Sequence, residues 1–283
     1  PAFQILLRKA QISAACTDKE ADYDMLSSLL LHRVHQENNR ERNLGITKAI
    51  EIVDQIDEQA LVALTIVYTM SKIIPVASNV DLALQNFDEV YKKLLNGNIL
   101  PLGEEWMEHL DMLSAIRMNA KGIGAFYKME EFFPKVMDQF IVTGLPSDSE
   151  DLYKIIIDLR NNGIPTDIII DNPLVKGNKI INPLVSDTEK IMFISHYSGQ
   201  SVEKKPNEQQ ILTIKRAIQK FRELEGTDKP IDEFWCRWNS FPNLKNIREW
   251  FNQLPVLFNV TAIGRALVAA YVVGKIPSLK IPY

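Results

Sequence analysis

The sequence is poor in cysteine and in long hydrophobic runs, and it has no excess of positive charge. Its two cysteines, Cys16 and Cys236, lie far apart and have no CxxC partner, so we expect two reduced thiols rather than a zinc site or a disulfide. The longest apolar run, residues 60–70, is too short to cross a bilayer, which takes about 20 residues. The net charge of −4 argues against a main role in coating nucleic acid or an anionic membrane. A cytoplasmic protein without a transmembrane segment is therefore predicted.

Strong motifs for phosphate and zinc chemistry are missing as well, since neither GxxxxGK[ST] nor HExxH occurs. The Gly-Ile-Gly at 122–124 lacks the third glycine of a dinucleotide-binding loop and predicts a tight turn. His32 and His35 share a helix face, but the polar residues that follow indicate a solvated helix end. Ser195 and His196 place a hydroxyl beside an imidazole, yet neighbours in a helix point in different directions. We expect no catalytic, cofactor-binding or metal-binding residue.

The sequence is rich in helical periodicity. Hydrophobic residues make up 46% of the 283 residues, enough to bury two modest cores. The clearest pattern spans residues 44–73, where apolar residues fall at helical spacing, Asp57 offers an N-cap, and a helix apolar on nearly every side follows. This segment predicts a buried antiparallel helix pair.

The fold class that these patterns predict is mainly α, a multi-helix orthogonal or antiparallel bundle in two halves. At most a short strand or extended segment is expected near 164–185, around the β-branched run 168–170. The halves are a helical bundle at 1–145 and a helical domain at 146–283 with an extended loop region and a terminal tail. The boundary is placed at the Gly-Leu-Pro of residues 144–146.

Helix starts are predicted by capping boxes at 17–20, 147–150 and 186–189, each with Ser or Thr three residues before Glu. Further helices are expected at about 81–95, 103–117, 128–142, 207–224, 230–239, 244–251 and 261–273. In the last of these, Thr261 is the predicted cap. Gly264 follows within the first turn, and we expect it to allow close packing against another helix, because glycine is otherwise costly there.

Two patterns leave other functions open. Asp171, Glu203 and Lys205 are the residue types with which metal-dependent nucleases bind a divalent ion, provided that they lie on adjacent strands. The region 204–250 combines cations with tryptophans, which suits nucleic-acid binding by charge and stacking, although nearby glutamates offset the charge and the tryptophans also suit a core. The residues concerned are Lys215, Arg216, Lys220, Arg222, Trp235, Trp238 and Trp250.

Three stretches carry distinctive packing and turn motifs, at 48–65, 114–133 and 260–268. Together they resemble the bacterial LPO/Vpar family of locus-tag proteins, which has no assigned function. The resemblance extends over nearly the whole chain, implies a mostly helical fold and assigns no catalytic residue. It also implies an additional N-terminal segment, in agreement with a chain that begins at Pro1 with an apolar stripe.

We therefore expect a non-catalytic interaction or regulatory protein of the bacterial cytoplasm, associated with phage defence or stress. It would act by self-association or by binding a protein partner. The alternatives are a metal-dependent nuclease that uses Asp171, Glu203 and Lys205, or a nucleic-acid-binding module formed by residues 204–250.

Overall fold

The computed structural model describes residues 2–35, 39–118, 128–185, 193–197, 200–222, 229–255, 258–279 and 281. These residues form twelve α-helices, three short 3₁₀ turns and a few short antiparallel strands, so the prediction of a mainly α protein is confirmed. The chain divides into two compact units, and both are discontinuous in sequence. Unit 1 comprises Pro1–Ile73, Asp88–Phe132 and Asn243–Tyr283, and unit 2 comprises Ile74–Phe87 and Phe133–Pro242.

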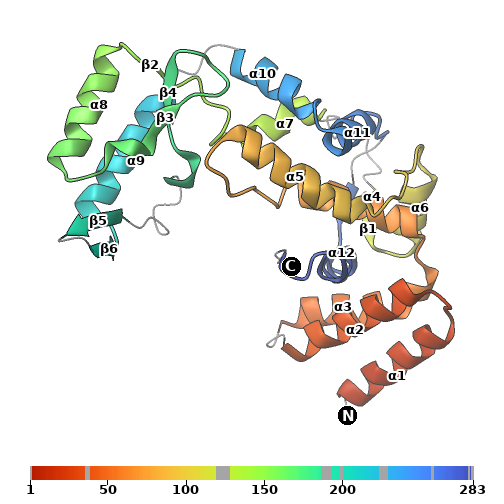
Figure 1. Ribbon diagram of the computed structural model, residues 1–283. Helices are drawn as coiled ribbons and strands as arrows, with labels where there is room; N and C mark the ends of the chain where they lie inside the picture. The colour runs from red at the N-terminus through yellow and green to blue at the C-terminus, as the bar shows by residue number, and fades with distance from the viewer. Residues whose placement is uncertain are drawn as a thin grey trace. The chain divides into compact units, whose positions relative to one another are not determined.

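Unit 1 is organised around α12. This helix packs against α2, α3 and α4, and α1 contacts α2 and α3 (Figure 1). The helices that lie wholly within unit 1 are α1 (Ala2–Ala15), α2 (Glu20–His35), α3 (Arg40–Ile52), α4 (Glu58–Met70), α6 (Glu105–Met112) and α12 (Ala262–Lys275). A two-stranded antiparallel sheet pairs β1 (Ile116–Met118) with β7 (Phe258–Val260).

Three helices extend across the division of the chain. Residues 80–87 of α5 (Val80–Leu95) belong to unit 2 and residues 88–95 to unit 1. In α7 (Met129–Val136) the division falls after residue 132, and α11 (Pro242–Phe251) lies in unit 1 from residue 243.

α12 is central because its sequence is almost entirely apolar. Leu267, Val268 and Tyr271 are buried, and the Tyr271 hydroxyl donates a hydrogen bond to the Leu94 carbonyl oxygen at 2.9 Å. The predicted cap is confirmed, since the Thr261 hydroxyl oxygen accepts from the amides of both Ile263 and Gly264. Burial on several sides explains why this helix tolerates few polar residues.

The segment 44–73 is buried as predicted, but its partner differs from our expectation. Ile46, Ile50 and Leu64 are fully buried, and the Asp57 side chain caps α4 by accepting from the Ala60 amide at 2.9 Å. However, α3 and α4 both pack against α12 rather than mainly against each other. A helix that the sequence places about 200 residues later fills the space between them.

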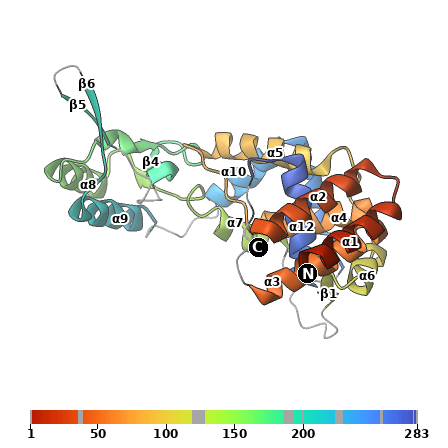
Figure 2. The ribbon, with the colours of Figure 1, turned by 90° about the horizontal axis from the view of Figure 1, so that it is seen from below.

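Unit 2 combines helices with a small sheet. Its wholly internal helices are α8 (Glu150–Asn161), α9 (Glu208–Arg222) and α10 (Lys229–Trp238). A three-stranded antiparallel sheet has the order β2 (Leu145–Pro146), β4 (Asn178–Ile181), β3 (Ile169–Asp171). A separate hairpin pairs β5 (Phe193–Tyr197) with β6 (Gln200–Lys204) and extends away from the helices of the unit (Figure 2).

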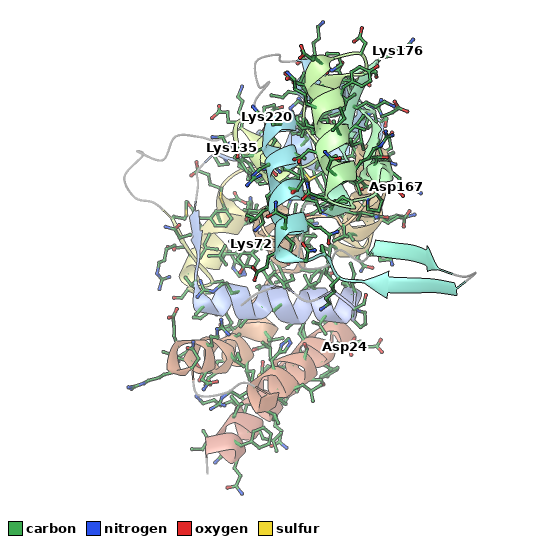
Figure 3. All side chains as sticks on the ribbon, turned by 90° about the vertical axis from the view of Figure 1, so that its left-hand side faces the viewer. Asp24, Lys72, Lys135, Asp167, Lys176 and Lys220 are labelled. Carbon is green, nitrogen blue, oxygen red and sulfur yellow. The ribbon has the colours of Figure 1, made fainter. Side chains whose placement is uncertain are left out.

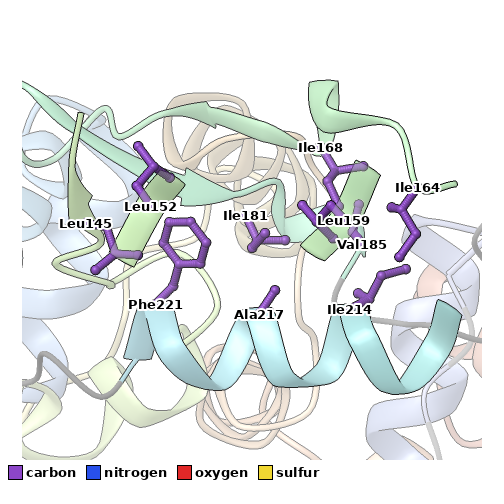
Figure 4. Close-up of a cluster of buried hydrophobic side chains, with 10 residues drawn as sticks. All are labelled: Leu145, Leu152, Leu159, Ile164, Ile168, Ile181, Val185, Ile214, Ala217 and Phe221. Atoms are coloured by element: carbon purple, nitrogen blue, oxygen red, sulfur yellow. The ribbon is translucent and has the colours of Figure 1, made fainter. Parts of the chain in front are cut away.

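Two clusters of buried side chains stabilise unit 2. In the first, α8 and α9 pack with the sheet, and the side chains meet between the two helices (Figure 4). Its members are Leu145, Leu152, Leu159, Ile164, Ile168, Ile181, Val185, Ile214, Ala217 and Phe221. The second is aromatic and comprises Phe87, Phe133, Phe234, Trp235 and Trp238, with neighbouring ring centroids 4.9–6.5 Å apart. These separations are typical of favourable tilted and edge-to-face pairs.

Strands are more numerous than the sequence predicted. β3 and β4 lie within the expected region 164–185, whereas β1, β2, β5, β6 and β7 lie outside it. The capping box at 186–189 lies outside the described residues, and residues 193–197 after it form a strand rather than the expected helix. β5 pairs with β6 so that Phe193 lies opposite Lys204 and Tyr197 opposite Gln200. This strand pairing overrides the local sequence preference for a helix.

The division of the chain also differs from the expected boundary after residue 145. Leu145 and Pro146 pair with β4 inside unit 2, and a Cβ atom at Gly144 would lie 2.2 Å from the Lys179 carbonyl oxygen. The glycine is therefore required by close strand packing and a φ of +71°, not by a linker. Residues 243–283 join the N-terminal helices because α12 fills their common core.

Candidate interaction surface

α1 is the outermost helix of its group in unit 1. It packs on α2 and α3, while α12 covers α2 and α3 from the other side (Figure 1). The inner face of α1 is formed by Leu6, Ala10 and Ser13, which are all buried. Every third or fourth residue faces inward, as helical geometry requires. The remaining faces of α1 are left open.

Polar contacts with α3 and the turn after it fix the position of α1. The Lys9 ammonium group forms an ion pair with the Glu51 carboxylate, and the Ser13 hydroxyl donates to Asp54 Oδ1 at 2.7 Å. Glu51 also accepts from Lys48 Nζ at 2.7 Å. Burial alone would raise the pKa of Glu51, but the hydrogen bonds and charges of Lys48 and Lys9 outweigh it and hold the pKa below its ordinary value.

The open faces of α1 carry four large apolar side chains among polar ones. Phe3, Ile5, Leu7 and Ile12 are all exposed, between 40% for Leu7 and 60% for Ile5. By helical geometry Ile5 and Ile12 lie on one side of the buried face of α1, and Phe3 and Leu7 lie on the other. We call these four side chains the α1 surface. Single exposed apolar residues are common on any protein, whereas several on one helix are typical of a surface that binds another molecule.

A groove adjoins the α1 surface. It is lined by Phe3, Ile5, Leu6 and Lys9 of α1 together with Arg33 of α2 and Thr47 of α3, and it encloses about 630 Å³, part of it open to solvent. Its lining is apolar with a cationic edge. A concave apolar surface with a few polar groups is the usual form of a binding site.

The predicted nuclease residues do not lie on one sheet. Asp171 ends β3 and accepts a hydrogen bond from Lys179 Nζ of β4 at 2.7 Å. Glu203 belongs to β6 in the other sheet of unit 2, and its side chain lies outside the described residues. Lys205 is exposed. Among described side chains, no group of three or more His, Cys, Asp or Glu is placed to hold a metal ion.

The tryptophans of the basic region are core residues. Trp235, Trp238 and Trp250 are buried, and the Trp250 indole N–H donates to the Pro101 carbonyl oxygen at 2.7 Å. They offer no open ring face on which a nucleic acid base could stack. Lys215 and Arg216 are exposed on α9, as is Lys220 (Figure 3). Arg222 forms an ion pair with Asp138.

The remaining candidates can be placed only in part. His32 is half-buried on α2, and the side chain of His35 lies outside the described residues, as does the glycine turn at 122–124. Ser195 and His196 lie on β5, not on a helix. Successive strand residues point to opposite faces, so the two would still not face each other.

Sequence reasoning missed the α1 surface. The apolar stripe at the start of the chain correctly indicated a helix, but its members Phe3 and Leu7 are exposed rather than buried. Ile5 and Ile12 are residue types that usually lie in a core, so the sequence did not mark them as exposed either. A usable signal was present. Apolar residues occur at too many angles around α1 to be covered by one packing contact.

A protein-family model described as ":-like" matches the chain over residues 1–283. The chain belongs to this family. The family is uncharacterised and its description states no activity, which is consistent with the resemblance to the LPO/Vpar locus-tag proteins. No curated protein and no solved structure matches the chain. Among the described helices, none combines the length and apolar character needed to cross a membrane.

Proposed function

We propose that this chain is a non-catalytic interaction protein of the bacterial cytoplasm that binds a protein partner through the α1 surface. The observation that supports the proposal is the exposure of Phe3, Ile5, Leu7 and Ile12 on an outermost helix. Fully burying one such side chain contributes roughly 1.5–3 kcal/mol. A partner that covers this surface would therefore gain substantial binding free energy.

The chain offers a closely matched control for this proposal. Tyr153 and Ile157 lie on α8 in unit 2 and are each 57% exposed, compared with 60% for Ile5 and 59% for Ile12. Both pairs lie on well-formed helices. Replacing either pair with serine removes similar exposed apolar area, and each change should alter stability by no more than about 0.5 kcal/mol.

The experiment compares the wild type, Ile5→Ser/Ile12→Ser and Tyr153→Ser/Ile157→Ser. Sedimentation velocity of each purified protein measures self-association. Affinity capture from bacterial lysate, followed by reconstitution with the purified captured protein, measures binding to another protein. We expect one of these interactions in the wild type, its loss in the α1 variant and its retention in the α8 variant. An interaction that both variants retain would show that α1 is not the binding surface.

The nuclease alternative has its own test. Plasmid DNA and RNA are incubated with the wild type, with and without Mg²⁺ or Mn²⁺. We expect no cleavage. Metal-dependent cleavage that disappears in Glu203→Ala would contradict a non-catalytic function.

A further inference from the structure

We propose that the α1 surface binds an acidic amphipathic helix of a partner protein, with carboxylates of that helix at Arg8 and Arg33. This inference rests on the proposed function and specifies the chemistry of the partner. It is carried by the distribution of charge around α1 and by the lining of the adjoining groove.

The carboxylates that face α1 are already engaged within the chain. Glu51 is held by Lys9 and Lys48, and Asp54 accepts from Ser13. α1 itself contains no Asp or Glu.

Two cations of the same surface have no ion-pair partner among the described residues. Arg8 is exposed and Arg33 is half-buried at the groove, and neither forms an ion pair with any carboxylate in the part of the chain that the structure describes. Arg8, Lys9, Arg33 and Lys48 outnumber the carboxylates Glu51 and Asp54, so the local charge is positive although the whole chain carries −4. A bound partner would complement it with carboxylates.

The groove supplies the apolar half of the recognition. Phe3, Ile5 and Leu6 line it, while Arg33 and Thr47 provide polar groups at its edge. An amphipathic helix places apolar side chains at spacings of three and four residues, and it inserts them into such a groove while its polar flanks meet the rim. Glutamates on one flank would reach Arg33 at the groove, and glutamates on the other would reach Arg8, which is exposed on α1 outside the groove lining.

An anionic membrane fits these observations less well. Recognition of anionic lipid by charge ordinarily uses clusters of about four to eight Lys or Arg, whereas Arg8 and Arg33 are the cations of this surface that remain after Lys9 pairs with Glu51. The face of α1 formed by Leu6, Ala10 and Ser13 is also already buried against the protein. The buried face cannot insert into a bilayer while α1 stays docked.

The probes are two synthetic helical peptides of about 16–20 residues. They share one leucine stripe and carry either glutamates or lysines on its flanks. Fluorescence anisotropy measures their binding to the full chain. We expect the Glu peptide to bind about tenfold more tightly than the Lys peptide, with a smaller ratio at high salt. Arg8→Glu/Arg33→Glu should reverse the preference, and Arg8→Gln/Arg33→Gln should abolish it.

The matched control is Lys215→Glu/Arg216→Glu, which makes the same change in net charge on exposed residues of α9. It should leave the peptide preference unchanged.

If both peptides bind equally and Ile5→Ser/Ile12→Ser abolishes that binding, the proposal of an acidic partner is wrong, but the proposed function is supported. If neither peptide binds, the proposal of a helical partner is wrong. The capture experiment then tests the proposed function on its own. Charge-dependent binding to phosphatidylserine vesicles without binding to the Glu peptide would also overturn it.

Discussion

Gly264 has no room for a side chain. A Cβ atom there would lie 2.2 Å from the Ala115 carbonyl oxygen and 2.9 Å from Val260 Cγ1. The same carbonyl oxygen accepts from the Thr261 amide at 3.1 Å and from the Thr261 hydroxyl at 2.9 Å. The predicted close approach is confirmed, but the neighbour is the backbone just before β1 rather than another helix. The glycine lets the first turn of α12 reach this backbone.

The first prediction compares two glycines of α12. Gly264→Ala should destabilise the protein by about 1–3 kcal/mol, because the added methyl group meets fixed backbone. Gly274→Ala is the control. A Cβ there has no neighbour within 4 Å, and alanine favours a helix by up to about 1 kcal/mol. Urea unfolding measures both, and equal stability of the two variants would show that Gly264 is not closely packed.

The second prediction concerns the core around α4. Leu64 is fully buried, so Leu64→Ala should reduce the free energy of unfolding by about 2–5 kcal/mol through the lost contacts and the remaining cavity. Leu102→Ala, at an exposed leucine, should change it by no more than about 0.5 kcal/mol. Thermal and urea unfolding provide the measurement. A Leu64→Ala protein as stable as the wild type would place the core elsewhere.

At the scale of single elements, α1 depends on few buried residues. Only Leu6, Ala10 and Ser13 among its described side chains are buried, so its apolar contribution is small and its polar contacts matter more. The Lys9–Glu51 ion pair joins it directly to α3. α1 is therefore expected to be among the first elements to exchange with solvent.

The third prediction follows from Glu51. Its pKa is lower in the folded protein than the ordinary value of 4.5. A carboxylate with a lowered folded pKa stabilises the fold above its unfolded pKa, and this contribution disappears as the pH falls through the folded value. The ion pair with Lys9 should accordingly hold α1 at neutral pH and release it in acid.

Hydrogen exchange of the α1 amides tests this prediction in the wild type and in Glu51→Gln. At pH 7 the variant should exchange faster, by a free-energy difference of a few tenths to about 1 kcal/mol. After correction for intrinsic rates, the difference should shrink below pH 4.5 as Glu51 is protonated. A difference independent of pH would mean that the Glu51 charge does not hold α1.

At the scale of the whole molecule, the two compact units do not coincide with two continuous halves. Unit 1 needs residues 243–283, because α12 packs against α2, α3 and α4. Unit 2 needs Ile74–Phe87, which contribute Phe87 to the aromatic cluster. They also contribute Asp81, whose two carboxylate oxygens both accept from Arg237 Nη1 at 2.6 Å. Neither unit can therefore be produced by a single cut.

The fourth prediction is that a fragment of residues 1–145 will not fold cooperatively. Without α12, the apolar faces of α3 and α4 would remain in water. Trp106 is the single tryptophan of the fragment, so its near-ultraviolet circular dichroism reports local packing, and urea unfolding reports cooperativity. We expect weak dichroism and a broad transition. A sharp transition would instead support an independent N-terminal domain at 1–145.

The sequence predicted much of the local structure but little of the candidate site. The spacing of apolar residues and the capping residues along the chain were sufficient to predict the positions of α5, α8, α9 and α10 to within a few residues. The α1 surface could not be recognised in this way, because Ile5 and Ile12 have the composition of core residues and only neighbouring elements decide whether they are covered. The nuclease hypothesis required Asp171 and Glu203 on adjacent strands, and the sequence could not show that their strands belong to different sheets.

The sequence by itself determined where helices begin and which of them are apolar enough to be buried. Asp57 and Thr261 cap their helices as predicted, because a cap uses hydrogen bonds within one turn. Only the tertiary structure decided that α12 fills the space between α3 and α4, and that residues 243–283 complete unit 1. These outcomes depend on apolar faces distant in sequence, and the hydrophobic effect that joins them is non-directional. Which faces meet is therefore settled by the packing of the whole chain.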